Sequence, residues 1–145
     1  MHKLISGFRE FRHGYYAENR EFFEHLATKQ QKPIALFITC SDSRINPNLL
    51  TQTEPGDLFL IRNAGNIVPP HGFAGGEAAT IEYSVEVLGI RDIVVCGHSQ
   101  CGAVQAMLAG DKVRHLPNVR AWCHHAEAAR RIVQHKYRDL PAAEL

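Results

Sequence analysis

Two short apolar runs, separated by one helical pattern, constrain the fold of this chain most. The first, IALFIT at residues 34–39, and the second, within RDIVVCG at 91–97, are continuously apolar, which is typical of strands buried in a parallel sheet. Between them, apolar residues recur at helical spacing and Gly89 supplies a helix stop; these positions are Ala78, Ile81, Val85 and Leu88. A strand, a crossover helix and a second strand predict parallel pairing of the two strands.

The remaining pattern predicts further elements around this pair. Aromatic and leucine side chains recur at helical spacing over residues 3–27, which indicates one or two amphipathic helices. A short strand is expected at about 58–62, and further helices from about residue 99 and over 119–137. We therefore expect an α/β fold in which helices flank a central, mostly parallel β-sheet, with an N-terminal helical arm.

Length and composition favour one domain. The chain has 145 residues, of which 45% are hydrophobic, enough to bury a core of its own. We interpret 1–145 as a single domain in which 1–30 form the helical arm and 33–145 the α/β core. No run approaches the ~18 apolar residues of a membrane span, and no signal peptide is expected, which predicts a cytoplasmic protein. The net charge of +1, with both signs interspersed, indicates neither a nucleic acid nor a membrane as partner.

Groups with metal-binding chemistry follow both predicted strands. Cys40 closes the first strand, while His98 and Cys101 form an H-x-x-C pair after the second. Because ligands of open α/β sheets bind at the carboxyl ends of the strands, these side chains are expected to meet there. Two thiolates and one imidazole suit Zn²⁺, and three protein ligands are typical of a catalytic site. Asp42 can fill the fourth position or hydrogen-bond its occupant, and Arg44 can hold Asp42 as a bidentate partner.

Other interpretations remain open at this point. On spacing alone, a thiol buried as a small hydrophobic group explains Cys40 as well as a metal site does. Cys96 lies inside an apolar run and is interpreted as a packing residue. For the thiol and two imidazoles at residues 123–125, a solvated helix face is favoured over a second metal site. The GHSQC motif resembles a nucleophile elbow around Ser99, but Cys101 stands where that motif requires glycine.

Four motifs, taken in order, resemble those of the β-class carbonic anhydrases: CSDSR, RNAGN, GGEAATIEYSVEVLGI and VCGHSQCGAV. The resemblance extends over nearly the whole chain. It implies one Zn²⁺ per chain, held by Cys40, His98 and Cys101. It also implies that Asp42 and Arg44 form the catalytic dyad, with Asp42 as a fourth zinc ligand in a closed state.

The same resemblance implies an activity, the zinc-dependent reversible hydration of CO₂ to bicarbonate and a proton. It implies a homodimer or a higher homo-oligomer, located in the cytoplasm, with a carboxysome or an organelle as alternatives. In the family, residues from both sides of a dimer interface complete the substrate pocket. The matching positions here are Gln31, Phe59, Ala64, Tyr83 and the backbone amide of Gly102.

Two alternative functions stay open beside this assignment. Members of the family usually continue further, with helix and an edge strand, so we expect the usual C-terminal tail to be lacking here. One alternative function is therefore a zinc-binding or bicarbonate-binding module with weak or no turnover, which a CO₂ hydration assay would separate from an enzyme. The other is a hydrolase of CS₂ or COS on the same scaffold, although nothing in the sequence indicates the narrowed access route that this would need.

Overall fold

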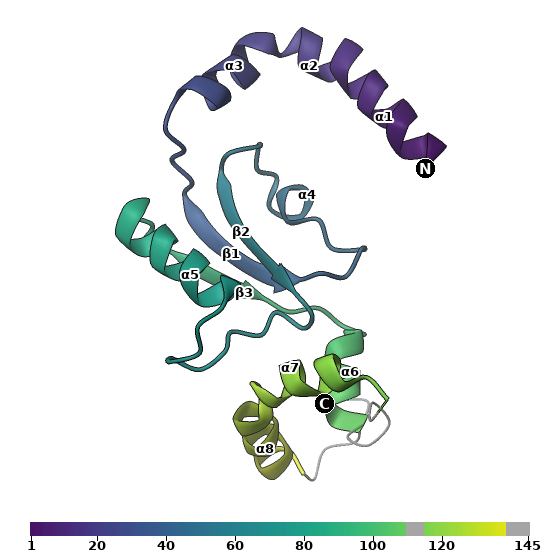
Figure 1. Ribbon diagram of the computed structural model, residues 1–145, viewed down its shortest axis with the longest axis vertical. Coiled ribbons are helices and arrows are strands. Elements are labelled where there is room, and N and C mark those ends of the chain that lie inside the picture. The colour runs from purple at the N-terminus through teal and green to yellow at the C-terminus, as the bar shows by residue number, and fades with distance from the viewer. Residues whose placement is uncertain (110–114, 139–145) are drawn as a thin grey trace. The chain divides into compact units, whose positions relative to one another are not determined.

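The computed structural model describes residues 1–109 and 115–138, and the chain divides into two compact units, Met1–Lys32 and Pro33–Leu145 (Figure 1). Of the predicted core at 33–145, residues 110–114 and 139–145 lie outside the described part. Within that part, every helix falls short of the length and apolar character of a membrane span.

The Met1–Lys32 unit is a run of three helices, where the sequence predicted one or two. They are α1 (His2–His13), α2 (Tyr15–Glu18) and α3 (Arg20–Thr28). The breaks fall at Gly14 and Asn19, which leave helical dihedral angles. Rings from all three helices pack together across these breaks, with Phe23 edge-on to Phe11 at a centroid distance of 5.5 Å.

The Pro33–Leu145 unit contains a parallel sheet in the order β2-β1-β3, which confirms the predicted α/β fold. Its strands are β1 (Ala35–Cys40), β2 (Leu58–Asn63) and β3 (Ile93–Cys96). The central strand β1 is buried from Leu36 to Cys40, as its continuously apolar sequence predicted. β1 pairs with β2 from Ala35 opposite Leu58 to Cys40 opposite Asn63.

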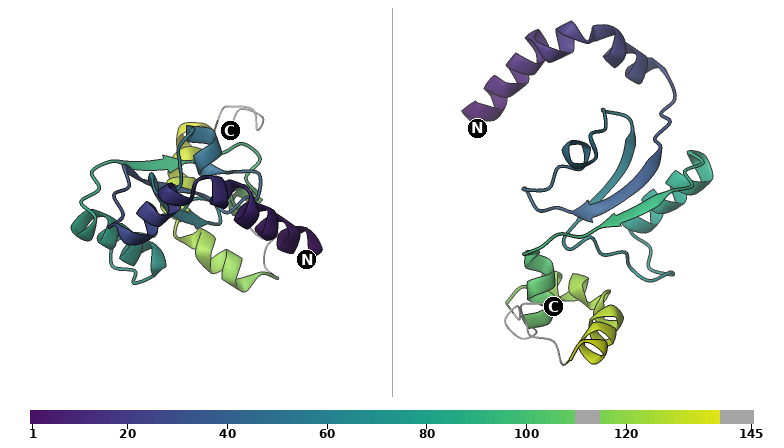
Figure 2. Two further views of the ribbon diagram at one scale, coloured as in Figure 1. Left: turned by 90° about the horizontal axis from the view of Figure 1, so that it is seen from above. Right: turned by 180° about the vertical axis from the view of Figure 1, so that it is seen from behind.

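The core of this unit lies between the sheet and α5 (Gly76–Glu82), which runs along the sheet in both Figures 1 and 2. Four buried aliphatic side chains form its centre, and Phe59, Ile81 and Leu88 pack against them; the four are Leu36, Ile38, Ile61 and Ile90. After α5 the helix widens into a π-helical turn, η1 (Tyr83–Val87), whose last bond runs from the Leu88 N–H to the Tyr83 carbonyl.

Four further helices complete the described structure: α4 (Pro47–Thr51), α6 (Gly102–Ala109), α7 (Pro117–His124) and α8 (Glu127–Lys136). The last three gather beyond the carboxyl ends of the strands (Figure 1). The single helix predicted over 119–137 is divided between α7 and α8. The division has a local cause, because the N–H groups of His125 and Ala126 bond to carbonyls only three residues back, which tightens and ends α7.

Candidate metal centre

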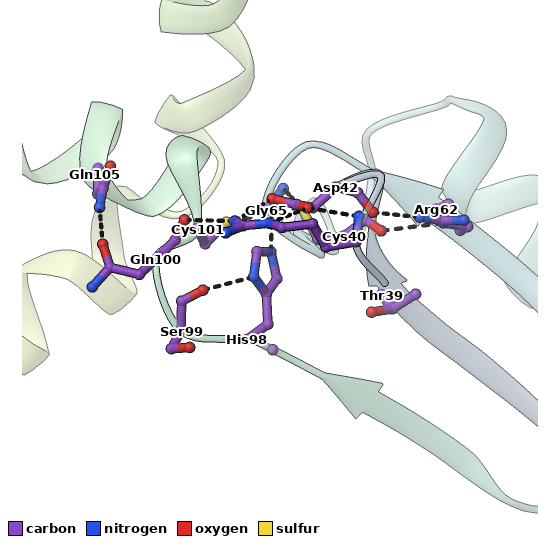
Figure 3. Close-up of polar contacts among 12 residues, drawn as sticks. Thr39, Cys40, Asp42, Arg62, Gly65, His98, Ser99, Gln100, Cys101 and Gln105 are labelled. Atoms are coloured by element: carbon purple, nitrogen blue, oxygen red, sulfur yellow. Dashed lines mark hydrogen bonds and ion pairs between the residues drawn. The ribbon is translucent and has the colours of Figure 1, made fainter. Parts of the chain in front are cut away.

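The pairing of β1 with β3 brings the two groups of candidate ligands to one edge of the sheet. Thr39 lies opposite Cys96 in the register, and its buried hydroxyl donates to the Cys96 carbonyl at 2.9 Å. The residues that follow each strand therefore emerge side by side. The Sγ atoms of Cys40 and Cys101 and a ring nitrogen of His98 all lie within 4.8 Å of one another (Figure 3).

The geometry of this cluster fits a tetrahedral zinc ion. The two sulfur atoms of Cys40 and Cys101 are 3.8 Å apart. Two thiolates bound at ~2.3 Å to a tetrahedral zinc would stand about 3.8 Å apart, so no rearrangement of the thiols is needed. Nδ1 of His98 lies 2.8 Å from the Ser99 carbonyl, and Nε2 is buried without a hydrogen-bond partner. A ring that donates from Nδ1 to a carbonyl presents the Nε2 lone pair, as metal-bound histidines do.

The surroundings of Cys40 favour its thiolate form. Burial raises the pKa of this thiol, but the Gly65 N–H and the His98 ring oppose that effect and lower the pKa to about 7. The Gly65 nitrogen lies 3.4 Å from the sulfur. Metal binding requires a deprotonated thiol, so these contacts prepare Cys40 as a ligand.

Asp42 lies beside the cluster and is held by Arg44. Nε and Nη2 of Arg44 donate to the two carboxylate oxygens at 2.9 and 2.8 Å, and the Arg44 backbone N–H donates to Oδ1 at 3.0 Å. These bonds hold the pKa of Asp42 far below its usual range, so the carboxylate stays ionised. Its Oδ2 atom lies 4.0 Å from Nε2 of His98. The carboxylate is thus next to the metal position but directed onto the guanidinium.

Arg62 holds the turn between the ligand and the carboxylate, a role that sequence reasoning missed. Its Nε donates to the Cys40 carbonyl at 3.1 Å and its Nη2 to the Asp42 carbonyl at 2.9 Å. Arg62 belongs to the RNAGN motif, but only the pairing of β2 with β1 reveals what it contacts.

The proposed pocket residues fall into separate groups. Ala64 directly precedes Gly65, and Gly102 directly follows Cys101, so both lie at the ligand cluster. Phe59 and Tyr83 pair with each other at a ring-centroid distance of 6.0 Å, away from that cluster. Phe59 lies opposite Leu36 in the register, four residues before Cys40, which is about 13 Å along the strand.

The remaining candidates lie in other parts of the chain. Gln31 belongs to the Met1–Lys32 unit, and its place in the pocket stays a prediction. Among residues 1–109 and 115–138, the structure brings together no second group of histidine, cysteine or acidic side chains suited to a metal. Cys123 is buried with its sulfur 3.9 Å from the Ala103 carbonyl, and burial raises the pKa of this thiol.

A parallel sheet that presents two thiols and an imidazole at its carboxyl edge, with an ionised carboxylate beside them, defines a metalloprotein of the α/β class with a catalytic type of donor set. Residues 35–144 match the family model described as carbonic anhydrase. The carbonic anhydrase of Synechococcus elongatus is 53% identical to this chain over 147 residues, which cover 100% of the chain and 54% of that protein. The chain belongs to the carbonic anhydrase family.

Solved structures agree with this assignment and specify the β class. The structure of the β-carbonic anhydrase CcaA has a TM-score of 0.93 at 51% identity and covers 98% of this chain and 69% of that one. A solved chain described among two tetrameric β-carbonic anhydrases from Sordaria macrospora is similar at a TM-score of 0.81 and 31% identity, over 96% of this chain and 68% of that one. The chain spans little more than half the length of three curated relatives that it matches.

Proposed function

We propose that this chain carries the zinc centre of a β-carbonic anhydrase and that the protein catalyses the reversible hydration of CO₂ to bicarbonate and a proton. One observation carries the proposal: two thiols and an imidazole lie within 4.8 Å of one another, with the sulfur spacing of a tetrahedral zinc site. The sequence identity to carbonic anhydrases supports it independently.

In this proposal Cys40, His98 and Cys101 hold one Zn²⁺ per chain. Bound zinc supplies a Lewis acid that makes a water molecule nucleophilic at moderate pH. Asp42 accepts a hydrogen bond from the nucleophile and orients it towards CO₂. Arg44 fixes the direction of Asp42 and, by binding both of its oxygens, keeps the carboxylate out of the fourth metal position. Release of Asp42 from Arg44 would give the closed state, in which Asp42 is the fourth ligand.

The substrate pocket requires a second copy of the chain. CO₂ is small, apolar and uncharged, and Ala64 and the backbone amide of Gly102 can contact it from the chain that holds the metal. Phe59 lies about 13 Å along the sheet from Cys40 and pairs with Tyr83, which supports a pocket to which a neighbouring copy supplies these two residues. We assign Gln31 to the same interface. The tetrameric Sordaria relatives support a homo-oligomer here.

The test is CO₂ hydration by stopped flow, compared between the zinc-loaded protein and its Asp42→Asn variant at equal zinc content. Asparagine keeps the size of the side chain but loses the charge and the acceptor capacity of one oxygen. We expect kcat/KM to fall at least tenfold in the variant. Equal, accelerated rates in the two proteins would remove Asp42 from the mechanism, whereas a wild type that does not accelerate hydration would support a zinc-binding module without turnover.

A further inference from the structure

A single peptide group connects the side chain of Trp122 with the sulfur of Cys40. The indole Nε1–H of Trp122, on α7, donates to the carbonyl of Ala64 at 2.7 Å. The next N–H in the chain, that of Gly65, donates to Sγ of Cys40 at 3.4 Å. The carbonyl of Ala64 and the N–H of Gly65 belong to the same planar peptide unit and point in opposite directions. Trp122 and Cys40 therefore bind its two ends.

The orientation of this peptide is not fixed by the turn that contains it. The backbone N–H of Asn66 lies 3.5 Å from the Asn63 carbonyl, which closes a four-residue turn around Ala64 and Gly65. Gly65 has φ of +83°, the value of the third residue in a type II turn. A type I turn through the same four residues rotates the central peptide by roughly 180° and would direct its N–H away from the sulfur. Glycine adopts either form readily, so a contact outside the turn has to select one.

Packing contacts hold the side chain of Trp122 in place. Its ring stacks edge-on against His125 at a centroid distance of 5.5 Å, and His125 packs in the same manner on Phe73 at 4.9 Å. The neighbouring Cys123 is buried against the first turn of α6. An indole nitrogen can only donate, so it selects the peptide orientation that presents the carbonyl to it.

We propose that Trp122 is a positioning residue for the zinc ligand Cys40. By binding the Ala64 carbonyl, Trp122 keeps the Gly65 N–H directed at the thiolate. Hydrogen bonding at the carbonyl also polarises the peptide and strengthens the N–H as a donor. The bond to sulfur in turn fixes the thiolate in the direction of the metal. This inference rests on the zinc centre of the proposed function but not on CO₂ turnover.

The decisive variant is Trp122→Phe, which keeps an aromatic ring and removes the N–H donor. The rate of zinc release from the loaded protein to a chromophoric chelator is measured at neutral pH. Loss of contacts that orient a metal ligand typically costs 10- to 100-fold in affinity, so we expect release to be at least about tenfold faster. With cobalt(II) in place of zinc, the thiolate-to-cobalt charge-transfer band should shift, because the sulfur loses a hydrogen bond.

Glu127→Gln is the matched control for destabilisation of the same region. Glu127 binds Arg130 and Arg131 on α8 at 2.7 and 2.8 Å, so its carboxylate stabilises that helix rather than the Ala64–Gly65 turn. This variant should lower the thermal stability of the protein while zinc release and the cobalt spectrum stay at wild-type values. If the zinc release rate and the cobalt spectrum both change in Trp122→Phe but not in Glu127→Gln, Trp122 acts by positioning Cys40.

A second substitution covers the case in which Trp122→Phe does not fold. The chain has one tryptophan, so biosynthetic replacement by benzothienylalanine exchanges the indole N–H for sulfur at that site only, with nearly unchanged shape. Wild-type zinc release and cobalt spectrum in a folded variant without the N–H would overturn the proposal, as would equal effects in Glu127→Gln. A wild type that binds no zinc would overturn both proposals, whereas one that binds zinc without hydrating CO₂ would overturn only the proposed function.

Discussion

At the scale of single residues, the centre depends on ligand side chains that come from distant positions in the chain. Cys40 and Cys101 are 61 positions apart in the chain, yet their sulfur atoms lie 3.8 Å apart in a buried site. This spacing is that of two thiolates on one tetrahedral zinc ion, and Nε2 of His98 is buried without a hydrogen bond. Both observations support the proposed metal site.

Removal of one thiol should abolish metal binding. We expect Cys101→Ala to lose its zinc, because two remaining ligands cannot complete a stable site. Cys96→Ala is the matched control: this thiol ends β3 outside the ligand cluster and donates to the Gly97 carbonyl at 3.6 Å. Metal analysis of the purified variants is the measurement. Full zinc retention in Cys101→Ala would contradict the ligand assignment.

Arg44 should support catalysis by fixing the direction of the Asp42 carboxylate rather than by keeping that carboxylate ionised. Arg44 lowers the pKa of Asp42, so its loss raises that pKa towards the ordinary ~3.9, still well below neutral pH. Asp42 therefore remains ionised in Arg44→Ala from about pH 6.5 to 9, but is free to occupy the metal position. We expect kcat/KM for CO₂ hydration to fall by about 10²-fold or more across that range. Arg44→Lys keeps the charge and loses the bidentate contact, so its kcat/KM should lie between those of Arg44→Ala and the wild type. A kcat/KM of Arg44→Ala equal to that of the wild type would show that the Asp42–Arg44 pair has no role in catalysis.

At the scale of elements, the sequence predicted the strands and helices that follow from local hydrophobic patterns. The continuously apolar runs predicted β1 and β3, and the helix between them predicted parallel pairing. The break between α7 and α8 was not predicted, because it depends on three-residue hydrogen bonds at His125 and Ala126 that leave little trace in hydrophobic spacing. The contacts of Arg62 and Trp122 could not be predicted either, since each joins positions 20 or more residues apart.

The side-chain hydrogen bond of Thr39, which joins β1 to β3, should contribute measurably to the free energy of unfolding. Thr39 is fully buried, and its hydroxyl donates to the Cys96 carbonyl just before the strand leads to His98. Thr39→Val keeps the shape but leaves this carbonyl without the donor, which should cost about 1 to 3 kcal/mol of unfolding free energy. Denaturant unfolding measures the difference. Thr39→Ser, which keeps the hydroxyl, should retain the hydrogen bond and lose only a methyl group; equal stability of Thr39→Val and wild type would refute this role.

The ion pairs that begin α8 should give a stability difference that depends on pH. Hydrogen bonds from Arg130 and Arg131 lower the pKa of Glu127 from 4.5 to about 2. Because the folded pKa lies below the unfolded one, this contribution is fully present above about pH 4.5 and is lost as pH falls towards 2. The difference in Tm between wild type and Glu127→Gln should therefore shrink over that interval. A difference that is independent of pH would show that Glu127 acts through packing.

At the scale of the whole molecule, apolar surface and an incomplete pocket both indicate association. Leu4 and Phe8 on α1 are 74% and 65% exposed, and Phe11 and Tyr15 continue the same stripe. Exposed apolar stripes of this kind mark interaction surfaces. If Phe59 and Tyr83 line the proposed pocket, their separation from the ligand cluster along the sheet favours their supply by a second copy.

We expect at least a dimer in sedimentation experiments. Phe8→Lys should weaken association, because it places a charge in the apolar stripe. Ser6→Lys, on the opposite side of the same helix, adds the same charge and should leave the assembly unchanged. Fully active monomers of the wild type would contradict the shared pocket.

We propose that Cys40, His98 and Cys101 make the protein a zinc-dependent CO₂ hydratase. The most direct test is a titration of the metal-free protein with zinc, in which the CO₂ hydration rate is followed by stopped flow. We predict that the rate rises in proportion to added zinc, ends at one equivalent per chain, and does not rise in Cys101→Ala. A rate that is independent of zinc, or that rises equally in Cys101→Ala, would contradict the account.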